Sequence, residues 1–336
     1  MAGKRNNRGA GDLVVLAVTA AAYLVVGLLL NSGSLTRQIS NMLIPISVYI
    51  VLAVSLNLVV GLLGELSLGH AGFMSVGLFS GCLLSIALSE TLPLPLRLPL
   101  SMLLGGVVAA AFGLLVGLPA LRLKGDYLAI VTLACGEIIK NIITNLNITG
   151  GALGLDTGAI YSNAKTLLPY AAVLALLTVL VMMNLKRSRH GRAIMAIRDN
   201  RIAAESVGIH VTRYKLTVFT LAAFFAGAAG TLYGHCFANV KAAAFDYNMS
   251  IEILVIVVLG GMGSVPGSIL AAVVLQALPE ATRAFADYRM LIYAIVLILV
   301  MLVTNSPRLK ALVQSVHPAA LLERWKKQRK SKKEAA

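Results

Sequence analysis

Two groups of ionisable side chains stand inside otherwise apolar stretches of this sequence. Glu65 and His70 belong to the segment Gly61-Leu-Leu-Gly-Glu-Leu-Ser-Leu-Gly-His-Ala-Gly-Phe73, and Glu137 and Lys140 belong to a second apolar segment. Charge inside a membrane is costly unless it faces a cavity or a partner helix, so such residues are candidates for function. The glycines of the first segment also allow a helix to break, and broken helices carry the substrate sites of many membrane transporters.

Both groups also have a structural interpretation. The first segment could be a tightly packed turn between two helices, with Glu65 at the water interface. Glu137 and Lys140 are three residues apart, so on a helix they lie on one face and can pair. Structural pairs are more common than substrate sites, so we favour a possible buried pair at these two positions.

The composition is that of a membrane protein. Of the 336 residues, 58% are hydrophobic and 13% are charged, whereas about 25% are charged in soluble domains. The net charge of +15 is concentrated near the N-terminus, between residues 186 and 215, and from Arg324 to Lys333. Clusters of Lys and Arg between apolar segments stay on the cytoplasmic side of a membrane. The charge therefore predicts that both termini and the 186–215 loop are cytoplasmic, and it does not indicate nucleic-acid binding.

Apolar segments predict an all-α polytopic membrane protein with glycine-broken helices. Segments of spanning length are Leu13–Leu30, Ile39–Leu63, His70–Leu88, Leu100–Leu121, Tyr127–Leu146, Thr166–Leu185, Leu216–His235 and Met290–Val303. Two shorter apolar pieces flank Gly260-Gly-Met-Gly-Ser-Val-Pro-Gly267. If both pieces cross the membrane, about 10 transmembrane helices result, and if they are re-entrant, about 8. Broken segments in both halves allow a two-repeat architecture. The spacing of Gly77 and Gly81 suits close helix packing.

The predicted organisation has three parts. These are a cytoplasmic N-terminus (1–12), a transmembrane domain (13–305) with a cytoplasmic loop at 186–215, and a basic cytoplasmic tail (306–336). Within the loop, Ile197 to Val207 has the pattern of one amphipathic helix, ended by Gly208. Such a helix could lie on lipid headgroups or dock into a groove on a partner protein. External loops are expected at 90–99, which contains three prolines, and at 147–165.

Motifs for several chemistries are missing from the sequence. It has no Gly-x-x-x-x-Gly-Lys-Ser/Thr phosphate loop, so the chain is not expected to hydrolyse ATP. It has no His-Glu-x-x-His, Cys-x-x-Cys or Gly-x-Ser-x-Gly motif, and its five histidines are scattered. The three cysteines lie in or beside apolar segments and are expected to behave as small hydrophobes. We predict no catalytic residue, no metal site and no cofactor.

Four stretches carry a resemblance to a known family. They are Gly61-Leu-Leu-Gly-Glu-Leu-Ser-Leu-Gly-His-Ala-Gly-Phe73, Leu121-Arg-Leu-Lys-Gly-Asp-Tyr-Leu-Ala-Ile-Val-Thr-Leu133, Ile197-Arg-Asp-Asn-Arg-Ile-Ala-Ala-Glu-Ser-Val-Gly-Ile209 and Val258-Leu-Gly-Gly-Met-Gly-Ser-Val-Pro-Gly267. In order and content they resemble the membrane permease subunits of branched-chain amino-acid ABC importers, the LivM/LivH type. The resemblance covers about residues 40–305. It implies a multi-pass subunit of a bacterial or archaeal cell (inner) membrane, with a second homologous permease, two ABC ATPase subunits that bind the ATP, and an extracytoplasmic substrate-binding protein as partners.

The resemblance also implies roles for individual residues. Ile202-Ala-Ala-Glu-Ser-Val-Gly208 resembles the loop that such importers present to their ATPases, although many of them have glutamate in place of Ile202. The implied ATPase-coupling loop comprises Arg198, Ile202, Ala203, Ala204, Glu205 and Gly208. The implied translocation path comprises Gly61, Gly64, Glu65, Ser67, Gly69, His70, Phe73, Gly260, Gly261, Gly263, Ser264, Pro266 and Gly267. Relatives usually carry a neutral residue at position 65.

These features predict a permease subunit of an ATP-driven importer that works by alternating access. Branched-chain amino acids are the family's default substrate, and urea or amides are alternatives within the family. A self-powered secondary carrier is a different class, in which Glu65, Glu137 or Lys140 would couple transport to an ion. A membrane-embedded enzyme or scaffold is a further class, which a convergent polar cluster would indicate.

Overall fold

A computed structural model describes residues 3–33, 35–123, 125–281, 294–295 and 298. The predicted span Met290–Val303 lies almost entirely outside this part of the chain, and the basic tail lies wholly outside it. Residues 1–277 form one compact unit, and residues 278–336 belong to a second. The architecture below is that of the first unit.

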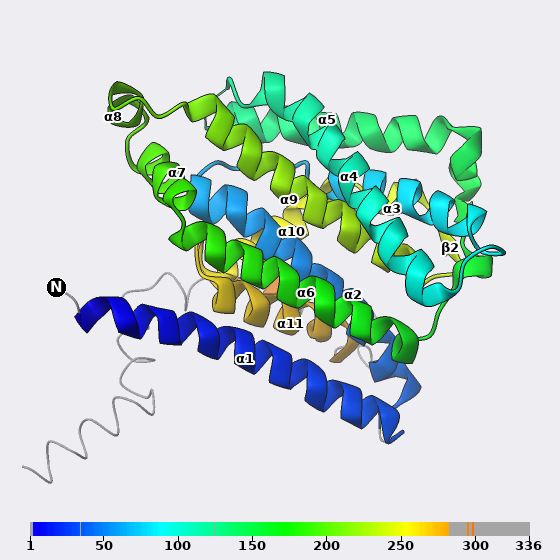
Figure 1. The fold of residues 1–336 in the computed structure, drawn as a ribbon. Helices are drawn as coiled ribbons and strands as arrows, with labels where there is room; N and C mark the ends of the chain where they lie inside the picture. The colour runs from blue at the N-terminus through cyan, green and yellow to red at the C-terminus, as the bar shows by residue number, and fades with distance from the viewer. Residues whose placement is uncertain (1–2, 34, 124, 282–293, 296–297, 299–336) are drawn as a thin grey trace, which may run out of the picture. The chain divides into compact units, whose positions relative to one another are not determined.

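The described chain consists almost entirely of helices (Figure 1). The α-helices are α1 (Gly3–Asn31), α2 (Arg37–Asn57), α3 (His70–Ala87), α4 (Leu94–Ala120), α5 (Asp126–Asn145), α6 (Ala164–Arg187), α7 (Arg189–Asp199), α8 (Arg201–Ser206), α9 (Val211–Gly234), α10 (Tyr247–Gly260) and α11 (Val265–Ala281). A π-helical turn, Leu58–Leu63, continues α2, and short 3-10 turns lie at Asn147–Thr149, Gly151–Leu153, Gly158–Ile160 and Ala242–Ala244. The strands β1 (Leu155–Asp156) and β2 (Asn239–Val240) form a two-stranded sheet.

Seven of the described helices are long and apolar enough to cross a membrane. They are α1 to α6, with α2 extended by its π-helical turn, and α9. The helices α10 and α11 are apolar but shorter. The prediction of an all-α polytopic membrane protein is therefore confirmed. The choice between eight and ten crossings depends partly on residues 290–303 and stays open.

Small residues form the tightest part of the first unit, where α3, α4 and α9 pack together. A Cβ on Gly77 of α3 would overlap the backbone of Gly227 in α9. The hydroxyl of Thr231 donates a hydrogen bond to the carbonyl oxygen of Gly77 (2.9 Å). Contacts of this kind let helix backbones approach closely, and they give membrane helices packing energy that apolar surface alone does not supply.

The chain runs back and forth between two ends of this unit. At the β end (residues 147–163 and 235–246), β1 and β2 pair antiparallel, with Leu155 opposite Val240. At the α7 end (residues 61–69, 186–213 and 261–264), the Lys186 ammonium donates to the carbonyl oxygen of Gly263 (2.7 Å). Figure 1 shows α7 and α8 on the left and β2 on the right. The two glycine-rich segments of the sequence therefore lie at the same end as the basic loop.

Two predicted loops were wrong in part. The helix α4 begins at Leu94, inside the expected loop 90–99. Amides in the first turn of a helix have no intrahelical acceptor, so Pro95 fits there without losing a hydrogen bond. The expected external loop 147–165 contains three 3-10 turns and β1, which no sequence pattern indicated.

Candidate functional site

The helices α7 and α8 replace the single amphipathic helix predicted for Ile197–Val207. Asn200 separates them, because its side-chain oxygen accepts a hydrogen bond from the amide of Ala203 (3.1 Å) and so begins α8. Asn side chains compete with helix hydrogen bonds in this way, which is why the continuous-helix prediction was wrong. Gly208, with φ of +83°, follows the end of α8, and the amide of Ile209 donates back to the carbonyl oxygen of Ala204 (3.1 Å).

Two large apolar side chains are exposed, one on α8 and one directly after its end. Ile202 is 80% exposed and Val207 is 75% exposed, whereas Ala204 is buried. Ala203 and Glu205 are exposed beside them, and Glu205 pairs with Arg201. Large apolar side chains that project from the end of a helical bundle mark a surface for a partner or for lipid.

The preceding helix, α7, contacts the first glycine-rich stretch through Arg198. Its guanidinium donates a hydrogen bond to the carbonyl oxygen of Gly61 (3.1 Å). Gly64 has φ of +79°, and a Cβ added there would lie 2.5 Å from Cγ of Arg198. Ile194 and Ile197 of α7 are buried against the bundle. The segment α7–α8 (residues 189–206) therefore connects the exposed residues of α8 directly to the break after α2.

The first glycine-rich stretch is a broken helix, as predicted. The π-helical turn ends at Gly64, residues 64–69 are non-helical, and α3 begins at His70. Side chains from other helices accept the hydrogen bonds of amides freed by the break. The amide of Leu68 donates to Oγ1 of Thr132 (3.0 Å), and the amide of Ala71 donates to Oγ of Ser250 (3.2 Å). Backbone groups within a membrane need such partners, since lipid offers none.

Asn57 joins this break to the second one. Its Nδ2 donates to the Ser264 carbonyl oxygen (3.2 Å) and to Oγ of Ser268 (2.8 Å), while its Oδ1 accepts from the amide of Gly263 (2.7 Å). A Cβ on Gly61 would overlap both Asn57 Oδ1 and the Gly263 amide nitrogen. The two breaks, about two hundred residues apart in the chain, are therefore in direct contact.

Glu65 is paired with a residue that sequence reasoning missed. Lys215 of α9 contacts the Glu65 carboxylate, and the two side chains are 4% and 15% exposed, respectively. The second carboxylate oxygen, Oε2, is buried without a hydrogen-bond partner among the described residues. Lys215 is the last residue of the basic run that predicts topology, and the apolar span begins at the next residue. That position at the start of a span was the sequence signal for an additional role.

Most of the predicted path residues are packed inside the chain. Gly61, Ser67, Gly69, His70 and Phe73 are buried, Gly64 is exposed and Glu65 is partly exposed. Nε2 of His70 lies 2.9 Å from the Ser55 hydroxyl, and Phe73 stacks edge to face on Phe219. In the second break Pro266 is exposed, and Gly260, Gly261, Gly263, Ser264 and Gly267 are partly exposed. The structure brings these residues together, and whether they line a path stays a prediction.

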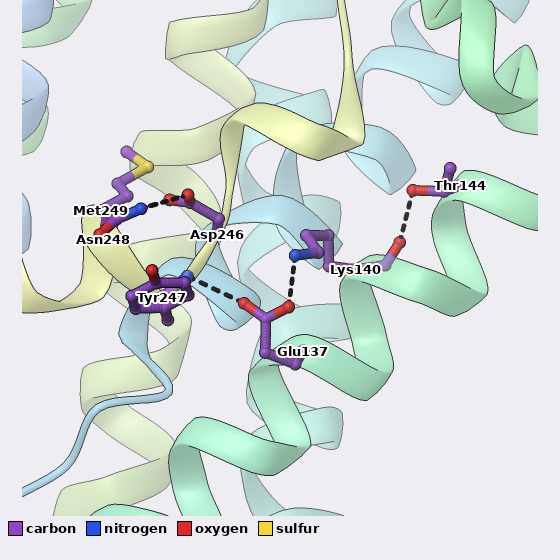
Figure 2. A network of polar contacts seen from close by, with 7 residues as sticks. All are labelled: Glu137, Lys140, Thr144, Asp246, Tyr247, Asn248 and Met249. Carbon is purple, nitrogen blue, oxygen red and sulfur yellow. Dashed lines mark hydrogen bonds and ion pairs between the residues drawn. The ribbon is translucent and has the colours of Figure 1, made fainter.

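Glu137 and Lys140 lie elsewhere, in the half of α5 that leads to the β end. Lys140 pairs with Oε2 of Glu137, and Oε1 of Glu137 accepts a hydrogen bond from the amide of Tyr247 (2.9 Å), as Figure 2 shows. The side chains of Lys140 and Glu137 are 19% and 27% exposed, so the pair is partly accessible rather than buried. Among the residues that the structure describes, no group of three or more His, Cys, Asp or Glu side chains could hold a metal ion.

The fold and this site define a multi-pass membrane protein with two joined helix breaks and an exposed helical segment beside them. The sequence profile of a family described as branched-chain amino acid transport system, permease component, matches residues 38–301. The chain belongs to this family of transport permeases.

Curated relatives agree with this assignment. The permease protein LivM of a high-affinity branched-chain amino acid transport system is 39% identical in Salmonella typhimurium and 38% identical in Escherichia coli, each over 288 residues. Each match covers 76% of this chain and 66% of the relative. The LivH permease protein of Escherichia coli is 23% identical over 276 residues, or 76% of this chain and 89% of the relative. No solved structure matches the chain significantly.

Proposed function

We propose that this chain is a permease subunit of an ATP-driven importer of branched-chain amino acids, and that separate ATPase subunits bind it at α8. One observation carries the proposal. The segment α7–α8 exposes Ile202 and Val207 on one side, and on the other side its Arg198 binds the backbone of the break at Gly61. A partner that grips α8 would therefore act on the break through α7.

The proposed mechanism is alternating access. ATP binding closes the two ATPases, and their motion displaces α7–α8. Arg198 transmits the displacement to Gly61, and Asn57 transmits it from there to the second break at Gly263. Discontinuous helices are suited to such a change, because few helical hydrogen bonds must be broken for them to move.

The orientation follows from charge. Lys and Arg are concentrated in the loop between α6 and α9, which lies at the α7 end. Such loops remain cytoplasmic, so the β end faces the outside, where a substrate-binding protein would deliver its cargo. We propose a cell (inner) membrane location with both termini cytoplasmic, and a complex with a second homologous permease, because relatives with both the LivM and the LivH names match this chain.

The candidate ion-coupling carboxylates are both engaged with lysines. Glu65 pairs with Lys215, and Glu137 pairs with Lys140. A secondary carrier needs a carboxylate that is free to bind its ion, and each of these carboxylates already contacts a lysine ammonium group. These pairs therefore favour the ATP-driven class.

Uptake by purified components tests the proposal. The chain is reconstituted in liposomes with the second permease, both ATPases and the binding protein, and uptake of L-leucine is measured with and without ATP inside. We expect uptake only with ATP. The Ile202→Asp variant should lower it about tenfold or more, because a charge in a buried contact removes most of its binding energy.

The matched control is Leu153→Asp, since Leu153 is 81% exposed at the β end and lies far from α8. This variant should transport normally. Uptake by the chain alone without ATP, or normal ATP-driven uptake by Ile202→Asp, would overturn the proposal.

A further inference from the structure

A stripe of polar side chains occupies half of the membrane-spanning helix α5. It comprises Glu137, Lys140, Asn141, Thr144 and Asn145, and these residues recur at helical spacing. Glu137 lies about 12 Å along the helix axis from the last residue of α5, because an α-helix rises about 1.5 Å per residue. The stripe therefore extends from the β end well into the depth that a membrane would cover.

Two residues of this stripe, Asn141 and Asn145, face away from the rest of the described chain, whereas Glu137 contacts α10. Asn141 and Asn145 are exposed, and they line an open groove of about 450 Å³ together with Ile138, Ile142 and Leu146. Amide side chains at membrane depth rarely face lipid, and they mark substrate pathways or the inside of a bundle. The exposed face of α4 shows the contrast, because Leu96, Leu100, Leu103 and Val107 are its exposed side chains near the same end.

The charged pair lies at the deep end of the stripe. Glu137 is held in place by two contacts, with Lys140 and with the first amide of α10 at Tyr247. The side chain of Asp246 fixes that turn by accepting from the amide of Met249 (3.1 Å), which Figure 2 shows beside the pair. A carboxylate and an ammonium group thus stand next to each other, both partly exposed, on the helix whose residues Ile138, Asn141, Ile142 and Asn145 line the groove.

We propose that this face of α5 lines the outer part of the translocation path, and that Glu137 and Lys140 receive the ammonium and carboxylate groups of a zwitterionic α-amino acid. The inference rests on the proposed function, which makes the β end the outer end. An α-amino acid carries its two charged groups on one carbon atom, so two adjacent opposite charges can bind both at once. A neutral solute such as urea has no use for this arrangement.

If Glu137 has only a structural role, its side chain does not need a charge. To hold α10 in place, the side chain needs only an oxygen that accepts from the Tyr247 amide. A glutamine supplies that oxygen but no charge. Glu137→Gln therefore separates the two roles, whereas removal of the whole side chain would not.

The first experiment asks whether the stripe faces water. In the complete complex, with Cys82, Cys135 and Cys236 replaced by alanine and ATP-driven uptake retained, Asn141→Cys is exposed to a membrane-impermeant thiol reagent from outside. We expect labelling, and slower labelling when the binding protein and saturating L-leucine are present. Leu100→Cys, at a comparable depth on the apolar face of α4, should stay unlabelled. Absence of labelling at position 141 would overturn the proposal.

The second experiment tests the charges. Glu137→Gln should lower uptake of L-leucine about tenfold or more, since a charge-assisted hydrogen bond is replaced by a neutral one. L-leucine should also no longer slow the labelling of Asn141→Cys. ATP hydrolysis and assembly of the complex should be unchanged.

Normal uptake by Glu137→Gln would show that the pair only fixes α10, and it would overturn the inference while leaving the proposed function intact. A failure of the proposed function has a different signature, because the unmodified complex would then show no ATP-driven uptake of L-leucine.

Discussion

Arg198 is the residue that joins the exposed segment to the membrane core. Its guanidinium reaches the Gly61 carbonyl oxygen, and its aliphatic part lies against Gly64. In the sequence, the family resemblance placed it in the implied ATPase-coupling loop, with no contact to the membrane helices. Its contact could not be predicted, because the partner is a backbone oxygen that a helix break leaves free, and no side-chain pattern records that.

Replacement of Arg198 should separate ATP hydrolysis from transport. In the reconstituted complex, Arg198→Ala should retain ATP hydrolysis but lose about tenfold or more of L-leucine uptake, because the charge-assisted bond to Gly61 is removed. Arg192→Ala is the control, since Arg192 lies on the same helix, is exposed and bonds to the carbonyl oxygen of Arg187 (3.1 Å). Equal uptake by the two variants would contradict the proposed transmission.

The pair of Glu65 and Lys215 should be stabilising only as a pair. Lys215→Met leaves the Glu65 carboxylate largely buried and unpaired, which costs about 3 kcal/mol or more of folding free energy. The double variant Glu65→Gln/Lys215→Met carries no buried charge and should recover most of that loss. Thermal unfolding in detergent measures both effects. A double variant as unstable as the single one would show that Lys215 acts through packing instead.

At the scale of elements, the contact between the two breaks depends on Asn57. This side chain makes three hydrogen bonds to the second break, and it is fully buried. Apolar runs of spanning length made the helices predictable, and glycines made the breaks predictable. That the breaks meet could not be predicted, because an asparagine inside an apolar span has many potential partners.

The variant Asn57→Leu tests this contact. It is expected to lower the free energy of unfolding by about 2 kcal/mol or more, because the partly buried amide of Gly263 and the hydroxyl of Ser268 lose the hydrogen bonds to a fully buried side chain. The measurement is thermal unfolding in detergent. Asn184→Leu, at an exposed position of α6, is the control and should change stability little. Similar midpoints for the two variants would mean that the breaks are held together without Asn57.

Local polar chemistry explains where the predicted helix boundaries failed. Asn200 divides the expected amphipathic helix because its side chain caps α8. Pro95 lies in the first turn of α4, although prolines at 93, 95 and 99 indicated a loop. Asn200 supplies a hydrogen-bond acceptor that begins a new helix, whereas Pro95 has no amide hydrogen and is tolerated in a first helical turn.

At the scale of the whole molecule, each end of the first unit has one proposed task. We propose that the α7 end receives mechanical work from ATPases and that the β end receives the amino acid. Composition predicted the membrane class, which the structure confirms, while the cytoplasmic side that charge indicates stays a prediction. The polar face of α5 was not predicted as a surface, because the sequence shows which residues share a helix face but not whether another helix covers it.

Cross-linking at α8 tests the central claim most directly. In membranes that contain the complete complex, Ile202→Cys is modified with a thiol-reactive benzophenone, and the products of illumination are identified. Leu153→Cys, equally exposed at the β end, is treated in the same way. The account predicts that position 202 cross-links to an ATPase subunit and position 153 does not. If position 202 gives no ATPase product, or reacts with a membrane-impermeant reagent added outside, the claim that α8 is the docking site is contradicted.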